Sequence, residues 1–93
     1  MTYKTITAKE AVALMAGDDS ALLIDVRTRD EFDEAHIFGA INFPLYELLE
    51  RVTCASVQFC QAIIIYCETG QRSRSAAMAL ACIGYTNVLL WQD

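Results

Sequence analysis

The sequence has one proline, one histidine and four glycines among its 93 residues, and it has no long apolar run. Every apolar stretch is far shorter than the roughly 20 residues that cross a bilayer, so the sequence predicts no membrane contact. A single histidine and the absence of a Cys-x-x-Cys pair leave too few ligands for a zinc site, and we expect no metal. A disordered chain is excluded, because 55% of the residues are hydrophobic and 20% are charged.

Basic residues are scarce as well, since seven lysines and arginines stand against twelve aspartates and glutamates, a formal charge of −5. This balance disfavours nucleic acid as a partner, although a locally positive pocket for a small anion can coexist with it. The first residues form no apolar signal segment, so we expect a cytoplasmic protein whose four cysteines stay reduced. The length suits one domain, and no linker or repeat divides it.

The stretch from residue 62 to residue 84 combines a buried strand, a polar loop and a helix. Its apolar run ends at Cys67, a short segment containing Gly70 follows, and an alanine-rich helix then continues to a predicted stop at Gly84. A continuous apolar run is typical of a parallel strand that is covered on both faces. The predicted helix places Ala76, Ala79, Leu80 and Ile83 on one stripe. Cys67 is therefore expected at the carboxyl end of a strand, facing a helix N-terminus, where α/β sheets bind ligands.

Such a position favours a reactive thiol at Cys67. Amide N–H groups of the loop and the helix dipole would point at the sulfur, and Arg72 and Arg74 outnumber the single anion Glu68. These surroundings lower a cysteine pKa and make the thiolate available as a nucleophile. The alternative is a small buried hydrophobe, which describes most free cysteines. The order of strand, cysteine, loop, arginine and helix favours the nucleophile.

The remaining segments alternate in the same way between short apolar runs and helical patterns. Capping boxes at Thr7–Glu10 and Thr28–Glu31 predict two helix starts, and Pro44 is expected in the first turn of a helix with apolar positions at Leu45, Leu48, Leu49 and Val52. Strands are expected at residues 3–6, 21–26, 40–43, 62–66 and 87–91. The sequence thus predicts an α/β fold, a small parallel β-sheet of about five strands flanked by helices on both faces. Packing roles are expected for the other three cysteines, Cys54, Cys60 and Cys82.

Four segments, in this order, resemble motifs of the rhodanese family. They are Asp25-Val26-Arg27 with Glu31-Phe32, the stretch from His36 to Pro44 (His-Ile-x-Gly-Ala-x-Asn-x-Pro), Cys67-x-x-Gly70-x-Arg72-Ser73, and Gly84-Tyr85-x-Asn87-Val88. The resemblance runs from about Ile6 to Val88 and implies a single rhodanese-like domain over residues 1–93. Family members usually continue with a Gly-Gly and a final helix, so this domain is expected to be truncated at the usual C-terminal helix, with apolar surface exposed near Leu90 and Trp91.

The resemblance also implies a sulfurtransferase that works without a cofactor. The catalytic residue would be Cys67, which takes a sulfane sulfur from thiosulfate or a persulfide donor and passes it, as a persulfide, to a thiol or cyanide. Carried over by position, the substrate cradle would comprise Glu68, Thr69, Gly70, Gln71, Arg72 and Ser73. Arg72 would close the loop and attract the anionic donor, with Arg74 a weaker candidate, and Gly70 would allow a tight bend. The implied partners are a small anionic donor such as thiosulfate and a thiol acceptor protein such as thioredoxin, on a monomer or weak homodimer.

These motifs also allow other interpretations. Cysteine phosphatases share the plan but use Cys-x5-Arg, and residue 73 is a serine, so the shorter loop suits one sulfur better than a phosphate. A rhodanese-fold relay or protein-interaction module, with little activity on free thiosulfate, is the alternative function, and the anion Glu68 is expected to weaken thiosulfate capture. Asp25, Arg27 and Glu31 are interpreted as a bracing set. His36 is either structural or a general base, and Cys60 is a candidate to resolve an oxidised Cys67.

Overall fold

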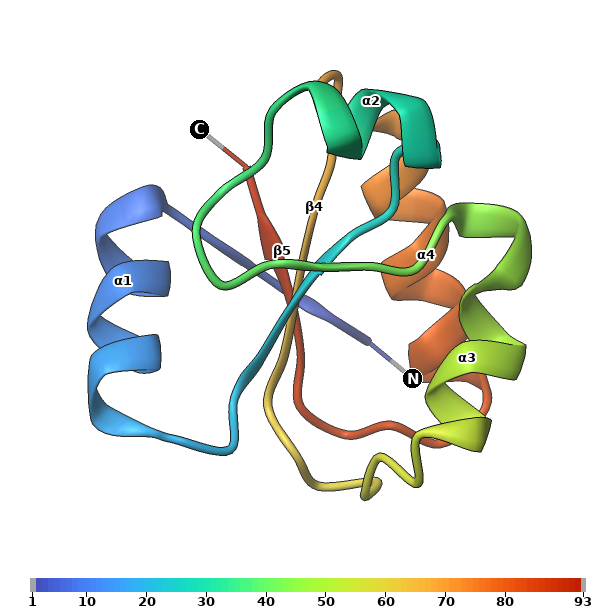
Figure 1. Ribbon diagram of the computed structural model, residues 1–93. Coiled ribbons are helices and arrows are strands. Elements are labelled where there is room, and N and C mark those ends of the chain that lie inside the picture. The colour runs from blue at the N-terminus through green and yellow to red at the C-terminus, as the bar shows by residue number, and fades with distance from the viewer. Residues whose placement is uncertain (1, 93) are drawn as a thin grey trace.

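The computed structural model describes residues 2–92 as alternating strands and helices around one sheet (Figure 1). In chain order the elements are β1 (Lys4–Ile6), α1 (Ala8–Gly17), β2 (Leu22–Asp25), α2 (Arg29–Glu34), β3 (Ile41–Asn42), the 3-10 helix η1 (Leu45–Glu47), α3 (Leu48–Cys54), β4 (Ile63–Tyr66), α4 (Gln71–Cys82) and β5 (Val88–Trp91). The strands form a five-stranded sheet in the order β1-β5-β4-β2-β3, and each pairing is parallel. The predicted fold class is confirmed.

Strand β4 lies at the centre of this sheet, between β5 and β2, and all four of its residues are buried. Successive side chains of a strand point to opposite faces, so an unbroken apolar run is what a strand covered on both faces requires. Ile63 and Ile65 pack with α3 and α4, and Ile64 packs with α1 on the other face. The run that ends at Cys67 is therefore the middle of the core.

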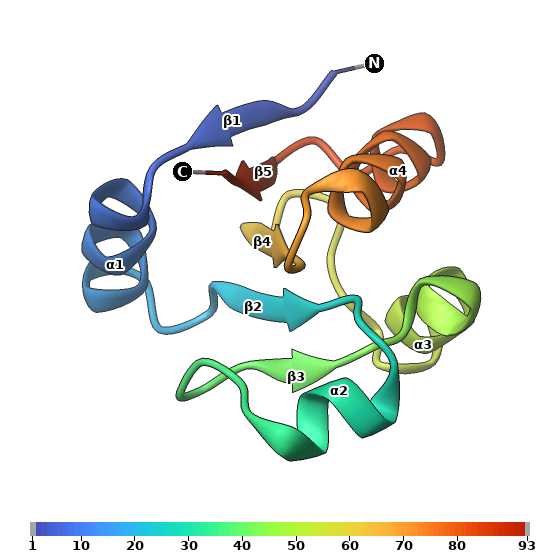
Figure 2. The same ribbon diagram turned by 90° about the horizontal axis from the view of Figure 1, so that it is seen from above.

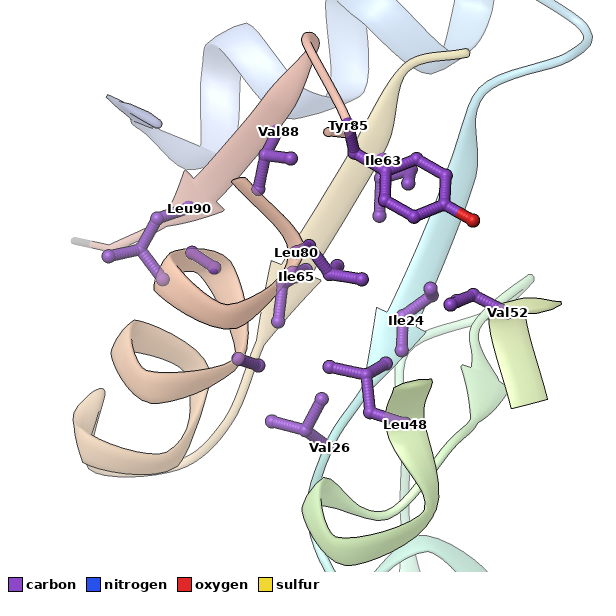
Figure 3. Packing of buried hydrophobic residues seen from close by; sticks show 12 residues of the cluster. Ile24, Val26, Leu48, Val52, Ile63, Ile65, Leu80, Tyr85, Val88 and Leu90 are labelled. Atoms are coloured by element: carbon purple, nitrogen blue, oxygen red, sulfur yellow. The ribbon is translucent and has the colours of Figure 1, made fainter. Parts of the chain in front are cut away.

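Two apolar layers hold the helices against the two faces of the sheet. Figure 3 shows the larger layer, in which Leu48 and Val52 of α3 and Leu80 of α4 converge on the isoleucines of β2 and β4. The smaller layer contains Ala11 of α1 together with neighbours from the sheet. Figure 2 shows α1 on one side of the strands and α3 and α4 on the other. Helices on both faces were predicted, and this is confirmed.

Both predicted capping boxes form. At α1 the Glu10 N–H donates to Thr7 Oγ1 (3.2 Å) and the Thr7 N–H donates to Glu10 Oε1 (3.0 Å). At α2 the same exchange joins Thr28 and Glu31, at 3.3 Å and 2.9 Å. Each box satisfies amide groups that a helix start leaves without partners, which explains why both helices begin where the sequence predicts.

Two predicted helical stripes are partly wrong. The buried side of α4 consists of Ser73, Ala76, Ala77, Leu80 and Ala81, whereas Ile83 lies beyond the helix and is 45% exposed. Pro44 has an extended conformation (ψ 147°) and precedes η1 instead of starting an α-helix, and Leu49 on α3 is 41% exposed. Ile83 leaves the predicted stripe because α4 ends at Cys82, and the 3-10 helix before α3 interrupts the stripe predicted after Pro44.

Predicted burial was wrong at four other positions. Cys54, Cys60 and Cys82 are all exposed, because they lie at the end of α3, in the connection before β4 and at the end of α4. Leu90, expected at an exposed apolar surface, is buried because β5 is an interior strand between β1 and β4. Trp91 is partly buried against the smaller apolar layer. Within residues 2–92 no helix has the length and apolar character that crossing a bilayer requires.

Candidate active site

The connection from β4 to α4 bends sharply around the Cys67 sulfur. Cys67 directly follows β4, and α4 begins four residues later at Gln71. Gly70, between them, is buried and has φ 86°, a left-handed conformation that residues with a Cβ rarely adopt. The bend predicted for Gly70 is therefore present, and it turns the first amides of α4 back toward the end of the strand.

The sulfur accepts hydrogen bonds from this bend. The Gly70 N–H donates to Cys67 Sγ (3.1 Å), and the Ser73 N–H donates to the same atom (3.2 Å). The Ser73 side chain is fully buried, with Oγ 3.3 Å from Sγ and 3.2 Å from the Gly70 carbonyl oxygen, to which it donates. These groups form a cradle that stabilises negative charge on sulfur at a helix N-terminus.

The cradle shifts the acidity of the thiol. Partial burial raises the pKa of Cys67, but hydrogen bonds from the Ser73 hydroxyl and amide, and from the Gly70 and Thr69 amides, lower it more. The net pKa lies below the ordinary cysteine value. More of the sulfur is therefore present as thiolate, the nucleophilic form.

Arg72 points to α2, where its guanidinium binds the Glu31 carboxylate through two hydrogen bonds. Nη1 donates to Oε1 (2.8 Å) and Nη2 to Oε2 (3.0 Å). The Arg72 hydrogen bond, followed by those from the Thr28 amide and hydroxyl, lowers the pKa of Glu31 to about 2. The pair ties the loop to α2, as closure of the loop requires. Donor capture by Arg72 stays a prediction.

The bracing set predicted from sequence separates into two ion pairs. The first is the Arg72–Glu31 pair. In the second, Arg27 binds the fully buried Asp25 carboxylate, with Nη2 2.8 Å from Oδ2, and also donates to the Ala35 carbonyl. Asn42 donates to the carbonyl oxygens of Asp25 (3.1 Å) and Arg27 (3.0 Å). Arg27 thus joins the end of β2 to the segment after α2, and the Asn42 side chain joins it to β3.

Tyr66, the residue before Cys67, is a member of the site that the sequence analysis missed. Its hydroxyl accepts the Ile37 N–H (3.1 Å), and burial followed by a hydrogen bond with Asp25 raises the pKa of Tyr66 to about 12. The sequence did contain a signal for this role, because Tyr66 carries the one hydroxyl group in the apolar run 62–66 and a buried phenol needs a hydrogen-bond partner. It fixes the segment after α2 beside the cradle.

Two adjoining hollows, each of about 330 Å³, open over the sulfur. Both are lined by Ile37, Tyr66, Cys67 and Glu68. The first also reaches Thr69, Gly70, Trp91 and Gln92, and the second reaches Arg27, Ala35 and His36. Cys67 is therefore accessible to a small reactant from solvent.

The other predicted site residues lie around these hollows. Glu68 and Thr69 are exposed at the mouth, Gln71 is exposed on the first turn of α4, and Arg74 is exposed on the same helix. His36 stacks on Phe32 with ring centroids 3.6 Å apart, and its Nδ1 lies 2.8 Å from the Phe32 carbonyl oxygen, which fits the structural interpretation. Cys60 precedes β4 and Cys67 follows it, so the strand separates the two sulfurs.

The relatives found by comparison with known proteins include proteins named thiosulfate sulfurtransferase. The chain is 38% identical over 65 residues to thiosulfate sulfurtransferase PspE of Escherichia coli, a match of 70% of this chain and 62% of that protein. It is 32% identical over 88 residues to thiosulfate sulfurtransferase GlpE of Coxiella burnetii, covering 95% of this chain and 79% of that protein. The chain thus spans a little under two thirds of the length of the E. coli relative.

A solved structure and a family match agree with these relatives. The human single-domain sulfurtransferase TSTD1 superposes with a TM-score of 0.80 at 26% identity, over 94% of this chain and 87% of the human one. Residues 7–92 match the Rhodanese-like domain, and this span holds the cradle, both ion pairs and the four strands β2 to β5. The chain belongs to the rhodanese-like domain family.

Proposed function

We propose that this chain is a sulfurtransferase that carries a sulfane sulfur as a persulfide on Cys67. The observation that carries the proposal is the pair of amides, from Gly70 and Ser73, that donate to Sγ at the N-terminus of α4. Relatives named thiosulfate sulfurtransferase support the same class of reaction. The donor is thiosulfate or a persulfide, and the acceptor is a thiol or cyanide.

The reaction consists of two displacements at sulfur. In the first, the Cys67 thiolate attacks the outer sulfur of the donor, the donor's sulfur–sulfur or sulfur–sulfonate bond breaks, and its electron pair leaves with the thiolate or sulfite. In the second, an acceptor thiolate or cyanide attacks the outer sulfur of the persulfide and regenerates the Cys67 thiolate. Electrons and atoms balance in each step, so neither step needs a cofactor. The amides that hold Sγ suit a partly anionic sulfur in both.

The chemistry of this reaction is the basis for proposing a cellular compartment and a sulfur acceptor. We propose a cytoplasmic location, because a nucleophilic thiolate persists where disulfides are reduced. A reduced dithiol protein such as thioredoxin is the proposed acceptor. Its first thiolate takes the outer sulfur as a persulfide, and its second thiolate attacks the inner sulfur of that persulfide, which forms the acceptor's disulfide and releases hydrogen sulfide.

Intact-mass measurement of sulfur loading tests the proposal. We expect reduced wild-type protein to gain one sulfur atom, about 32 Da, on incubation with thiosulfate or glutathione persulfide, and to lose it to cyanide as thiocyanate. Cys67→Ser should neither gain the mass nor release thiocyanate, whereas Cys60→Ser, which removes an exposed thiol, should behave as wild type. Loading that survives in Cys67→Ser contradicts the mechanism. Folded wild-type protein that loads from neither donor favours the interaction module instead.

A further inference from the structure

Two arginines near the Cys67 cradle are already matched by carboxylates. Arg72 donates two hydrogen bonds to Glu31, and Arg27, which lines the second hollow, is bound by the buried Asp25. Arg74, which follows Ser73 on α4, is exposed and lines neither hollow. Neither hollow, as defined by the described residues, is lined by any other lysine or arginine. A free dianion such as thiosulfate would therefore meet backbone amides at the sulfur but no unpaired cation on the way to it.

Two carboxylates lie in the lining of the hollows or next in sequence to a lining residue. Glu68 lines both hollows, and Glu34 directly precedes Ala35, which lines the second. Both carboxylates are exposed, and neither takes part in an ion pair within residues 2–92. These two carboxylates repel a dianion and attract a partner that carries positive charge around its reactive group.

An exposed aromatic side chain directly follows Ile37 in the sequence. Residues 37–40 form a turn that is closed by the Ala40 N–H donating to the Ile37 carbonyl (3.0 Å), with Gly39 at φ 88°. Ile37 lines both hollows, and the next residue, Phe38, is 99% exposed. Aromatic residues are enriched at the centres of protein interfaces, where a recess on the partner buries them.

From the paired cations, the two carboxylates and Phe38 we infer that the sulfur donor is a cysteine persulfide on a protein surface that is basic and has an apolar recess beside the reactive cysteine. The inference rests on the proposed function, because it takes Cys67 as the sulfur acceptor. We name Glu34, Phe38 and Glu68 together the docking rim. It recognises the protein that carries the sulfur, and the cradle receives the sulfur itself.

The transfer balances without any other reactant. The Cys67 thiolate attacks the outer sulfur of the partner's persulfide, the partner's sulfur–sulfur bond breaks, and its electron pair remains on the partner's cysteine as a thiolate. The proton of the transferred sulfur stays with it. The leaving thiolate is an anion, and basic residues around it on the partner stabilise it. This chain leaves that task to the partner, since Arg27 and Arg72 are already bound and Arg74 lines neither hollow.

Two synthetic peptides distinguish the donors. One is a persulfide of Lys-Leu-Cys-Leu-Lys and the other a persulfide of Glu-Leu-Cys-Leu-Glu, both with blocked termini, and thiosulfate is the third donor. The rate constant for persulfide formation on Cys67 is measured by quenched intact mass. We expect the basic peptide to load the protein roughly tenfold faster than the acidic one at low salt, and the ratio to fall to about threefold or less in 0.5 M NaCl.

Substitutions assign the preference to the docking rim. Glu34→Gln combined with Glu68→Gln should reduce the basic-to-acidic ratio to about twofold or less, and Phe38→Ser should lower the peptide rate relative to the thiosulfate rate. Glu50→Gln on α3 and Val12→Ser on α1 are matched controls, both exposed and outside the hollows, and they should keep the wild-type ratio.

The outcomes separate this inference from the proposed function. Equal rates for the two peptides, or thiosulfate reacting faster than the basic peptide, overturn the inferred donor while Cys67 loading itself stands. A preference that survives the double substitution of Glu34 and Glu68 overturns the role of the rim. If none of the three donors loads folded protein, the proposed function fails, and the donor inference fails with it.

Discussion

The buried hydroxyl of Ser73 lies between two acceptors but has a single hydrogen to donate. Its oxygen is 3.3 Å from Cys67 Sγ and 3.2 Å from the Gly70 carbonyl oxygen. When Cys67 is a thiol, the S–H donates to Oγ and the hydroxyl donates to Gly70. When Cys67 is a thiolate, the hydroxyl turns to the sulfur, because a hydrogen bond to an anion is the stronger one. Ser73 thus couples the protonation of the nucleophile to the bend that holds it.

Replacing Ser73 by alanine tests this coupling. The loss of one hydrogen bond to the thiolate should raise the pKa of Cys67 and slow its alkylation by iodoacetamide at pH 7 by roughly three- to tenfold. The rate is measured as a function of pH in a background of Cys54→Ser, Cys60→Ser and Cys82→Ser, which leaves one thiol. Ser75→Ala, an exposed serine on the same helix, is the control. An unchanged pH profile in Ser73→Ala contradicts the coupling.

A comparison of Gly70 with Gly17 tests whether the bend at Cys67 requires a glycine. Gly70→Ala forces a Cβ into φ 86° and should destabilise the protein by about 1–2 kcal/mol. Gly17 is the last residue of α1, and a Cβ there would meet nothing within 4 Å, so Gly17→Ala should be neutral or slightly stabilising. Urea unfolding of both variants measures the difference. Similar stabilities for the two would show that the bend tolerates a side chain.

At the scale of elements, helix α2 and the Cys67 loop share one carboxylate. Glu31 Oε1 accepts the Thr28 N–H (2.9 Å) and hydroxyl (3.0 Å) within the capping box, and it also accepts from Arg72 (2.8 Å). The start of α2 and the closure of the loop therefore depend on the same ionised group. Acid that protonates Glu31 weakens both at once.

The pH dependence of stability follows from Glu31. Its folded-state pKa, about 2, lies below the ordinary value of 4.5, so the folded protein holds this proton less tightly than the unfolded chain. The stability due to its ionised form is fully present above about pH 4.5 and is lost as the pH falls toward 2. In urea unfolding, the gap between wild type and Glu31→Gln should be constant from pH 7 to 5 and shrink between pH 4.5 and 2. A gap that stays constant down to pH 2 contradicts the assigned pairing.

The same pair allows the two roles of Arg72 to be separated. If Arg72 acts through Glu31, then Arg72→Ala and Glu31→Gln should each slow sulfur loading from thiosulfate by roughly three- to tenfold, and the double variant should lose no more than either one. Single-turnover loading over a range of thiosulfate concentrations measures the effect. A much larger loss for Arg72→Ala alone, seen as weaker donor binding, would instead assign direct donor capture to Arg72.

At the scale of the whole molecule, the sequence predicted the helices and strands more reliably than it predicted which residues contact one another in the fold. Cys67 and Gly70 could be predicted because strand, bend and helix are contiguous in the chain, so local patterns describe them. The partner of Arg72 could not, because Glu31 is 41 positions away and only the fold brings the two together. Burial failed for the same reason: Leu90 is covered because β5 lies between β1 and β4, and β1 comes from the other end of the chain.

Two leucines test this account of burial. Both lie in predicted apolar segments, but Leu90 is 1% exposed in an interior strand and Leu49 is 41% exposed on α3. Leu90→Ala should reduce the free energy of unfolding by about 2–5 kcal/mol, because it leaves a cavity in the larger apolar layer. Leu49→Ala should reduce it by less than about 1 kcal/mol. Equal losses in urea unfolding would contradict the assigned positions.

Cys67 and the amides that hold it come from seven consecutive residues, while Glu34 ends α2 and Phe38 lies in the connection after it. Two of the three residues of the docking rim are therefore separate in sequence from the cradle, and the third, Glu68, lies within it. Substitutions at residues 34–40 should change which donor the protein accepts and leave the sulfur chemistry intact. An engineer who wishes to redirect this protein would exchange residues 34–40 between relatives, vary Glu68, and retain Cys67, Gly70 and Ser73.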